Sequence, residues 1–193
     1  MNDDERFAFR FDSGATWLNL LATSGRTFGA HPVERIGDPE RLAQWFAACE
    51  LTPVTPPGPA DVERARRLRE TLRLLAMATV AGQRPPERAA REVADFLAAH
   101  HDPVRLTVAD RLLREPPADP GAALARIARQ AVDHLTGPDR GNLAVCAEHD
   151  CRGVFADPGG RRRWCPAPAC ASRGRVRALR ARRKADGGPA ASS

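Results

Sequence analysis

The sequence predicts a mainly α-helical N-terminal domain with a small β-hairpin element, followed by a small module in which a hairpin precedes a basic helix. Three observations support this order. Apolar residues recur at helical spacing through most of residues 1–139, whereas only short segments alternate with the β-strand period. Four of the five cysteines stand between residues 146 and 170. An arginine-rich stretch with helical character follows them.

The first elements are predicted within residues 7–49. Residues 7–11 (FAFRF) alternate apolar and polar side chains, which predicts a short strand. Residues 15–26 predict a buried helix closed by Gly25. Asp38 is a favourable N-cap, and the helix after it carries an apolar face at the spacing i, i+3, i+4 and i+7. That face comprises Leu42, Trp45, Phe46 and Cys49, so Cys49 is interpreted as a buried core thiol.

Longer helices are predicted next. Residues 61–81 predict an amphipathic helix whose arginines, including Arg69 and Arg73, point to solvent among acidic neighbours. Residues 87–100 predict another helix, and residues 104–113 alternate in a way that is typical of a β-hairpin. A last helix begins after Asp119 and ends at Gly137-Pro138.

Charge divides the chain into two parts. Residues 140–193 contain 12 basic and 4 acidic residues, a net charge of +8, whereas residues 1–139 contain 18 and 20, a net charge of −2. A basic field of this kind favours a polyanionic partner, nucleic acid first and an anionic membrane second. The N-terminus has no apolar targeting segment, and the longest uncharged apolar stretch, residues 74–83, is too short to span a bilayer. We therefore expect a cytoplasmic protein without a membrane span, in which cysteines stay reduced.

The four clustered cysteines predict a metal site. They form two C-x4-C pairs, Cys146/Cys151 and Cys165/Cys170, separated by 13 residues. Two such pairs provide the four thiolates of a closed tetrahedral site, which predicts one structural Zn²⁺ without an open catalytic position. His149 is an alternative ligand that this symmetric spacing leaves outside the shell. Between the pairs, residues 154–155 and 163–164 predict the two strands of a hairpin that turns at residues 157–160.

The arginine-rich stretch predicts a helix that starts near Cys165–Cys170 and runs towards Lys184. We expect this helix to contact nucleic acid. Only Val176 and Leu179 form an apolar spot on it, so we expect the helix to dock through these two residues with its guanidinium groups outward. Arginine suits both phosphate oxygens and guanine edges. The alternative interpretation is a solvated basic tail that balances the zinc thiolates. The predicted nucleic-acid-binding residues are Arg161, Arg162, Arg163, Arg173, Arg175, Arg177, Arg180, Arg182, Arg183 and Lys184.

The C-terminal module resembles the CGNR zinc finger. The resemblance rests on Phe155, Asp157, the run Arg162-Arg163-Trp164-Cys165 and the remaining cysteines. The signature that names the family is here Cys170-Ala171-Ser172-Arg173, so its first and last residues are kept and the two between them differ. The resemblance implies a zinc finger followed by a basic helix.

The N-terminal part resembles the ABATE domain, which usually precedes this finger. Its relatives carry a Leu-Asp-x-x-Asn-Thr run followed by Arg, and residues 18–23 with Arg26 hold that place here. Asn19 replaces the acid and Ala22 the amide, so a ligand pocket in relatives is altered here. The resemblance implies that Asn19, Thr23 and Arg26 line any such pocket. It also implies a bacterial, stress-linked transcription regulator.

Together these observations predict a zinc-containing DNA-binding regulator. Residues 1–139 form its ABATE-like domain, which senses a small-molecule effector or mediates assembly, including with a second copy of the chain. Residues 140–185 form the finger, and residues 186–193 form a disordered tail of small polar residues. Two alternatives are a protein-interaction module with a structural zinc, and RNA binding. No nucleophile–base pattern, phosphate-cradling loop or open metal motif indicates an enzyme.

Overall fold

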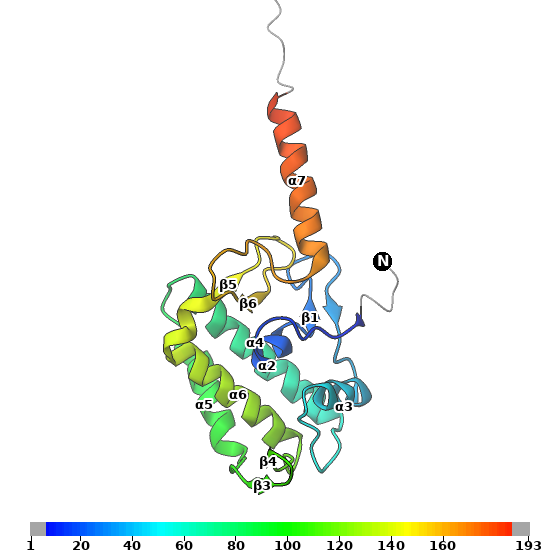
Figure 1. The fold of residues 1–193 in the computed structure, drawn as a ribbon, viewed down its shortest axis with the longest axis vertical. Helices are drawn as coiled ribbons and strands as arrows, with labels where there is room; N and C mark the ends of the chain where they lie inside the picture. Colours follow the sequence, from blue (N-terminus) through cyan, green and yellow to red (C-terminus); the bar gives the residue numbers. More distant parts are fainter. Residues whose placement is uncertain (1–6, 187–193) are drawn as a thin grey trace, which may run out of the picture.

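Helices α2 to α6 pack around one core in the computed structural model, which describes residues 7–186 (Figure 1). In chain order the N-terminal elements are α2 (Thr16–Leu21), β1 (Ser24–Gly25), β2 (Val33–Glu34), α3 (Pro39–Ala48), α4 (Pro59–Val80), α5 (Glu87–Ala99), β3 (Leu106–Val108), β4 (Leu112–Arg114) and α6 (Pro120–Thr136). The 3-10 helix η1 (Pro138–Asn142), β5 (Leu143–Val145), β6 (Val154–Ala156) and α7 (Pro168–Asp186) follow. Consecutive strands pair antiparallel as β1–β2, β3–β4 and β5–β6. The mainly α fold with a hairpin and helix at its C-terminal end is therefore confirmed.

Helix starts follow local capping chemistry. Asp38 accepts a hydrogen bond from the Arg41 amide at 2.8 Å, and Asp119 accepts one from the Ala122 amide at 2.8 Å. Each satisfies an N–H that the first turn leaves without an intrahelical partner. A proline follows each cap at the first helical position, where its missing N–H costs nothing. These two starts, of α3 and α6, lie where the sequence predicts them.

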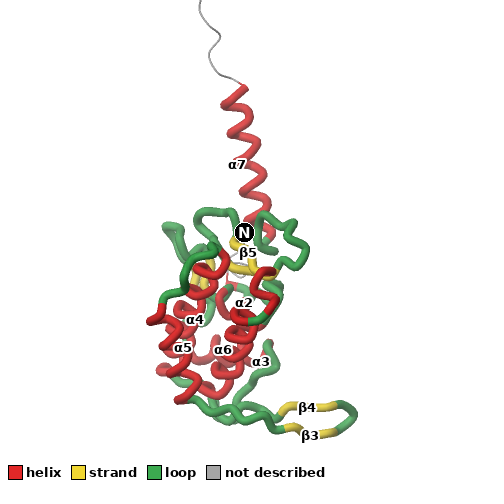
Figure 2. The backbone as a smooth tube through the Cα atoms, turned by 90° about the vertical axis from the view of Figure 1, so that its left-hand side faces the viewer, coloured by secondary structure: helices red, strands yellow, loops and turns green. Residues whose placement is uncertain are grey.

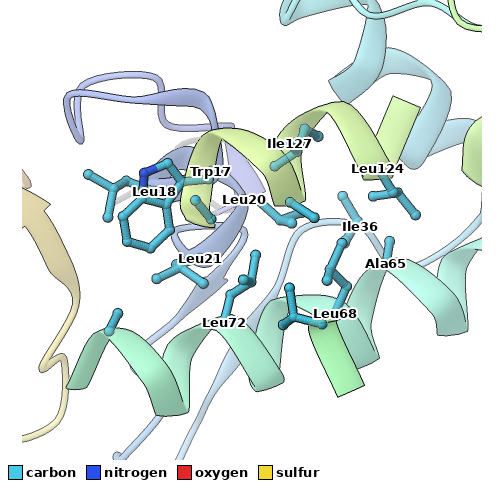
Figure 3. Close-up of a cluster of buried hydrophobic side chains, with 14 of the residues drawn as sticks. Trp17, Leu18, Leu20, Leu21, Ile36, Ala65, Leu68, Leu72, Leu124 and Ile127 are labelled. Atoms are coloured by element: carbon cyan, nitrogen blue, oxygen red, sulfur yellow. The ribbon is translucent and has the colours of Figure 1, made fainter. Parts of the chain in front are cut away.

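The core lies between α2, α4 and α6 (Figure 3). Helix α2 has six residues, too few to be stable alone, but Trp17, Leu18, Leu20 and Leu21 are all completely or almost completely buried. Packing therefore holds this helix in place. The Trp17 indole donates to His134 Nδ1 on α6 at 3.2 Å, which satisfies its only polar atom.

Two arginines of α4 correct the prediction that its basic face points to solvent. Arg69 and Arg73 are 4% and 5% exposed. Arg69 donates to both carboxylate oxygens of Glu34, at 2.8 and 2.7 Å, and to Thr23 Oγ1 at 2.9 Å. Arg73 donates to the Leu21 carbonyl at 2.9 Å, at the C-terminal end of α2. The chain between α2 and α3 covers this face of α4 and provides the acceptors, which helical periodicity alone does not reveal.

Residues 7–11 are not the predicted strand. Residues 8–11 form neither helix nor strand, and Arg35 and Arg41 donate to the carbonyls of Ala8 and Phe7. The predicted hairpin at residues 104–113 is present as β3–β4, at the opposite end of the molecule from α7 (Figure 2). Its apolar side chains at Leu106, Val108 and Leu112 are exposed.

The C-terminal hairpin differs from its prediction in one strand. β6 contains Val154 and Phe155 as expected, but it pairs with β5 rather than with residues 163–164. Arg163 and Trp164 lie in a bend that joins the sheet edge through one hydrogen bond, from the Ala147 amide to the Arg163 carbonyl. Leu143 and Val154 of this hairpin belong to the main core, so the C-terminal part shares a core with the N-terminal one.

Helix α7 projects from the rest of the molecule (Figures 1 and 2). It ends at Asp186, which is the first residue of the predicted disordered tail, and residues 187–193 of that tail lie outside the described residues. Within residues 7–186, no helix combines the length and apolarity needed to cross a membrane.

Candidate metal centre and nucleic-acid interface

Two short backbone turns bring the cysteines together. β5 leads into Cys146, whose amide donates to the Gly153 carbonyl at 2.9 Å, and Cys151 closes a turn on the Glu148 carbonyl at 3.0 Å. Arg152 after it has a φ of 44°, a left-handed conformation that reverses the chain into β6. The Cys170 amide donates to the Ala167 carbonyl at 3.0 Å in the first turn of α7. The β5–β6 hairpin thus carries Cys146 and Cys151, and the first turn of α7 carries Cys170.

The four sulfur atoms fit a zinc ion. Cys146, Cys151, Cys165 and Cys170 place their Sγ atoms within 4.8 Å of one another. The Sγ atoms of Cys151 and Cys165 are 3.9 Å apart. A tetrahedral site with Zn–S bonds of about 2.3 Å has S–S edges of about 3.8 Å. The cluster can therefore bind one zinc ion with four thiolates. His149 lies outside it and contacts Arg177 instead.

The four thiols have different pKa values because their sulfur atoms lie in close contact. The hydrogen bond with Cys151 lowers the pKa of Cys146 to about 7, and the one with Cys146 lowers the pKa of Cys165. Hydrogen bonds with Cys146 raise the pKa values of Cys151 and Cys170 above their usual range. Thiolates this close repel one another, so a bound cation is what allows all four to ionise.

Two arginines face the sulfur atoms. Arg10 NH1 lies 3.9 Å from Cys165 Sγ, and Arg173 NH2 lies 3.6 Å from Cys170 Sγ. They partly offset the formal −2 charge of a four-thiolate zinc site. The sequence does not predict the contact of Arg10 with the metal site, because Arg10 lies 155 residues from the cysteine that it contacts.

Two acidic residues that the sequence did not single out hold the base of α7. Glu148 and Asp150 lie between the first two cysteines and are 2% and 8% exposed. Glu148 accepts from Arg177 at 2.5 Å and lies 3.5 Å from Arg173 Nε, while Asp150 lies 3.3 Å from Arg173 NH2. Arg173 and Arg177 are one helical turn apart and so face the same side. The loop from Cys146 to Cys151 is the first knuckle of the metal site. The spacing of the two arginines, together with two acids in this knuckle, is the signal that could have predicted the contact.

Helix α7 does not dock through its apolar spot. Val176 and Leu179 are 46% and 50% exposed. The close contact lies one turn earlier, where buried Gly174 packs against Trp164. A Cβ atom at residue 174 would lie 2.3 Å from Trp164 Nε1, too close for any other residue without a shift. The indole and the two ion-paired arginines therefore fix the helix, and the predicted apolar anchor is wrong.

Comparisons with known families agree with this geometry. A family model described as "Putative stress-induced transcription regulator", the ABATE family, matches residues 14–138. The chain belongs to the ABATE family. The CGNR zinc-finger model matches residues 142–183, which include all four cysteines, β5, β6 and most of α7. A search of curated proteins gave no match. Both families are of regulator and zinc-finger type and neither is an enzyme family, so the chain is a zinc-binding regulator by family and by its cysteine cluster.

The basic residues of the CGNR finger fall into two groups. Arg173 and Arg177 are engaged with buried carboxylates. The other group is exposed and forms no ion pair among the described residues; it comprises Arg152, Arg161, Arg162, Arg163, Arg175, Arg180, Arg182 and Arg183. The side chain of Lys184 lies outside the described part of the chain.

The three residues expected to line a ligand pocket in the ABATE domain are placed differently from one another. Asn19 Oδ1 accepts from the Ser13 amide at 3.1 Å, and Thr23 hydrogen-bonds Leu20 and Arg69, so both are engaged inside the domain. Arg26 lies on the edge of a cavity of about 420 Å³, whose lining includes neither Asn19 nor Thr23. Arg10 and Arg35 of the same domain and Arg173 of the finger also line it.

Proposed function

We propose that this protein is a cytoplasmic DNA-binding transcription regulator in which the CGNR finger contacts DNA and the ABATE domain responds to a small ligand. The observation that supports it is the free part of α7. All residues from Arg175 to Arg183 are exposed, and this segment contains no acidic residue and five arginines, of which Arg177 alone is ion-paired among the described residues. A helix of this composition has no core to join and is stabilised by a polyanion.

The dimensions of α7 suit a DNA groove. Its 19 residues span about 28 Å at 1.5 Å per residue, and the major groove of about 12 Å width admits one α-helix. Arg175, Arg180, Arg182 and Arg183 lie on one side of the projecting part, over an arc of about 160° at about 100° per residue, so some reach phosphates at the edges of that arc while others face base edges. The exposed loop Arg161–Arg163 provides further contacts to phosphate.

The proposal divides the basic residues by role. Arg173 and Arg177 orient the helix through Glu148 and Asp150, and the exposed arginines bind DNA. Zinc acts indirectly, because Cys170 lies in the first turn of α7 and Cys146 and Cys151 border the acids that hold it. Removing the metal should therefore weaken DNA binding without removing any DNA-contacting group.

Fluorescence anisotropy with duplex DNA tests the proposal on the full chain. We expect zinc-loaded protein to bind, with affinity falling as salt rises from about 50 to about 200 mM, and chelation to weaken binding. The triple variant Arg180→Gln, Arg182→Gln, Arg183→Gln should reduce the slope of log affinity against log salt, by about 0.9 for each phosphate that is no longer neutralised.

Helix α5 provides a matched control with the same change in charge. Arg84, Arg88 and Arg91 lie just before or on α5, with side chains 83%, 91% and 73% exposed. Their triple substitution by glutamine should leave affinity and salt slope close to those of the wild type. Equal losses in both triple variants, or the absence of salt-sensitive binding by the zinc-loaded chain, would contradict the proposal.

A second candidate function is recognition of a protein partner by the same helix. Exposed Val176 and Leu179 favour it, because they lie one turn apart and form the apolar spot of an otherwise charged helix. This function predicts a partner complex that Val176→Ser with Leu179→Ser abolishes and that the triple arginine variant tolerates. DNA binding predicts the reverse sensitivity.

A further inference from the structure

The cavity that Arg26 borders lies between the ABATE domain and the finger. The end of α2 and strands β1 and β2 form one wall, including Leu21 and Val33. The finger forms the other wall, including Val154 and the start of α7 at Pro168. Its volume of about 420 Å³ falls within the range of about 300–1,000 Å³ typical of small-molecule sites.

The lining combines apolar side chains with four guanidinium groups and three of the zinc-site cysteines, Cys151, Cys165 and Cys170, and it contains no aspartate or glutamate. Two of these groups have a free donor. Arg26 Nε and Arg173 Nε are buried and, among the described residues, have no hydrogen-bond partner. Their nearest carboxylate oxygens, on Asp150 and Glu148, are each 3.5 Å away, beyond a good hydrogen bond. Buried donors without partners are rare in folded proteins, and these two are available to an acceptor that enters the cavity.

Arg35 is the least compensated of the four. Its Nε and NH1 donate to the carbonyls of Ala8 and Ala22, at 2.8 and 3.1 Å, and within residues 7–186 it forms no ion pair. Burial, followed by the charge of Arg10, lowers the pKa of Arg35, which is the effect expected of a partly buried cation without a counter-ion.

The position of Arg26 is fixed by the backbone. Its φ of 50° is left-handed, and the Gly29 amide donates to its carbonyl at 2.9 Å. The Phe28 amide donates to the Asp150 carbonyl at 3.2 Å, which ties this turn to the finger. The guanidinium is thus presented by a turn that both domains hold.

The zinc thiolates account for only part of this positive charge. Arg10 and Arg173 lie 3.9 and 3.6 Å from sulfur atoms, so their charge offsets the metal site. Neither Arg26 nor Arg35 has such a contact within the described residues. Arg35 has no ion-pair partner among the described residues and Arg26 has only the long contact to Asp150, so both can hold a separate anion.

We propose that this cavity binds a small organic carboxylate, whose carboxylate group Arg26 and Arg35 hold while its apolar body lies against Leu21, Val33 and Val154. Arginine forks match carboxylate geometry, and the apolar walls favour a carboxylate with a hydrocarbon body over inorganic phosphate. This inference rests on the proposed function, because it specifies the class of ligand that the ABATE domain senses. Since both domains line the cavity, occupancy also stabilises the docking of the finger on the ABATE domain.

Isothermal titration of the full, zinc-loaded chain with benzoate, cinnamate and octanoate tests the site, each compared with its neutral amide. We expect at least one carboxylate to bind, and to bind about tenfold or more tightly than its amide, because the amide cannot form the hydrogen bonds to a charged group. Inorganic phosphate should bind more weakly than that carboxylate. If none of the three binds, or if amide or phosphate binds equally well, the inference is wrong.

Arg26→Gln is the main variant, because within the described residues its side chain forms no hydrogen bond, only a long ion pair of 3.5 Å with Asp150, which keeps Arg173 at 3.3 Å. It should weaken carboxylate binding about tenfold or more while zinc content and circular dichroism stay unchanged. Arg35→Lys keeps a charge but loses the fork, and should weaken binding as well. Arg161→Gln, at an exposed arginine outside the cavity, is the matched control and should bind like the wild type. Wild-type affinity in Arg26→Gln would overturn the assignment.

The two proposals fail separately. Carboxylate binding is measured without DNA, and DNA binding without carboxylate. A chain that binds DNA but none of the carboxylates would refute the cavity and leave the regulator intact. A chain that binds a carboxylate but no DNA would refute the regulator and leave the cavity intact.

Discussion

Replacing Glu148 by glutamine removes the charge that holds the base of α7 and leaves the turn that contains it intact. The turn depends on the Glu148 carbonyl, which accepts from the amides of Cys151 and Arg152 at 3.0 and 2.9 Å, and the substitution keeps this backbone group. The side chain is 3% exposed and accepts from Arg177 at 2.5 Å, with Arg173 Nε at 3.5 Å. The change therefore isolates the anchor of the helix from the fold of the knuckle.

The structure sets the size of the effect. A hydrogen bond to a charged group contributes about 1.5–3 kcal/mol, and Glu148 forms one good contact and one long one. The side chains of Arg177 and Arg173 are 48% and 33% exposed, so water replaces part of what they lose. Arg173 also keeps Asp150 at 3.3 Å. We expect the docked state of α7 to lose about 2 kcal/mol, or about 30-fold in its opening equilibrium.

Hydrogen exchange measured by mass spectrometry on zinc-loaded protein tests this value. Amides in the first half of α7 should exchange about 30-fold faster in Glu148→Gln, while those of α4 and α6 stay unchanged. Glu63→Gln is the matched control, because that side chain is 66% exposed and, within residues 7–186, forms an ion pair only with Arg66. Exchange in α7 within about threefold of the wild type would refute the view that ion pairs, rather than the exposed apolar spot, anchor the helix.

Three further substitutions test other contacts. Gly174→Ala should gain about 1 kcal/mol of helix propensity but lose about 1–3 kcal/mol by overpacking against Trp164, so zinc affinity in chelator competition should fall. Arg69→Leu should lower the free energy of unfolding in urea by about 3 kcal/mol, because it removes the partner that binds both carboxylate oxygens of Glu34 and leaves only Arg66 at 3.5 Å, while exposed Arg67→Leu should have little effect. Asp102→Asn should cost about 3 kcal/mol at neutral pH, because it leaves three arginines facing a neutral group. Burial raises the pKa of Asp102 but hydrogen bonds from Arg126 lower it further, so the folded pKa lies below the unfolded one. The difference between wild type and Asp102→Asn should then shrink as urea unfolding is repeated below about pH 4, where the carboxylate of the unfolded chain takes up a proton, and it should vanish only below the lower folded pKa.

Local signals predicted much of the fold. The caps at Asp38 and Asp119 and the alternation around β3 each depend on a few neighbouring residues, so a sequence is enough to recognise them. The cysteine spacing predicted the metal cluster for the same reason. What failed depends on distant partners. Arg69 can be buried because it pairs with Glu34, which lies 35 residues away in the sequence. The strand that pairs with β6 is β5, which precedes the first clustered cysteine, rather than residues 163–164, which follow the turn.

The candidate site shows the same division. The sequence identified the arginines of α7 as one basic group, because nothing local separates Arg173 and Arg177 from the others. Glu148 and Asp150 separate them, and their role depends on a knuckle that only the folded metal site brings against the helix. Asn19 and Thr23 lay in the correct segment but face the interior, whereas Arg35, which the resemblance did not mark, lines the cavity.

The anchoring of α7 provides a physical route by which the proposed ligand would change the proposed DNA binding. The finger cannot swing freely, because Leu143 and Val154 belong to the main core and Asp150 accepts from Phe28 through its carbonyl. The carboxylate of Asp150 lies 3.5 Å from Arg26 and 3.3 Å from Arg173, so it joins the proposed ligand-binding arginine to the base of the projecting helix. An anion that draws Arg26 away from Asp150 would leave that carboxylate to Arg173 alone. The direction of α7 would then change through one ion pair, without movement of the core. Asp150→Asn should therefore uncouple carboxylate binding from DNA affinity while leaving each measurable by itself.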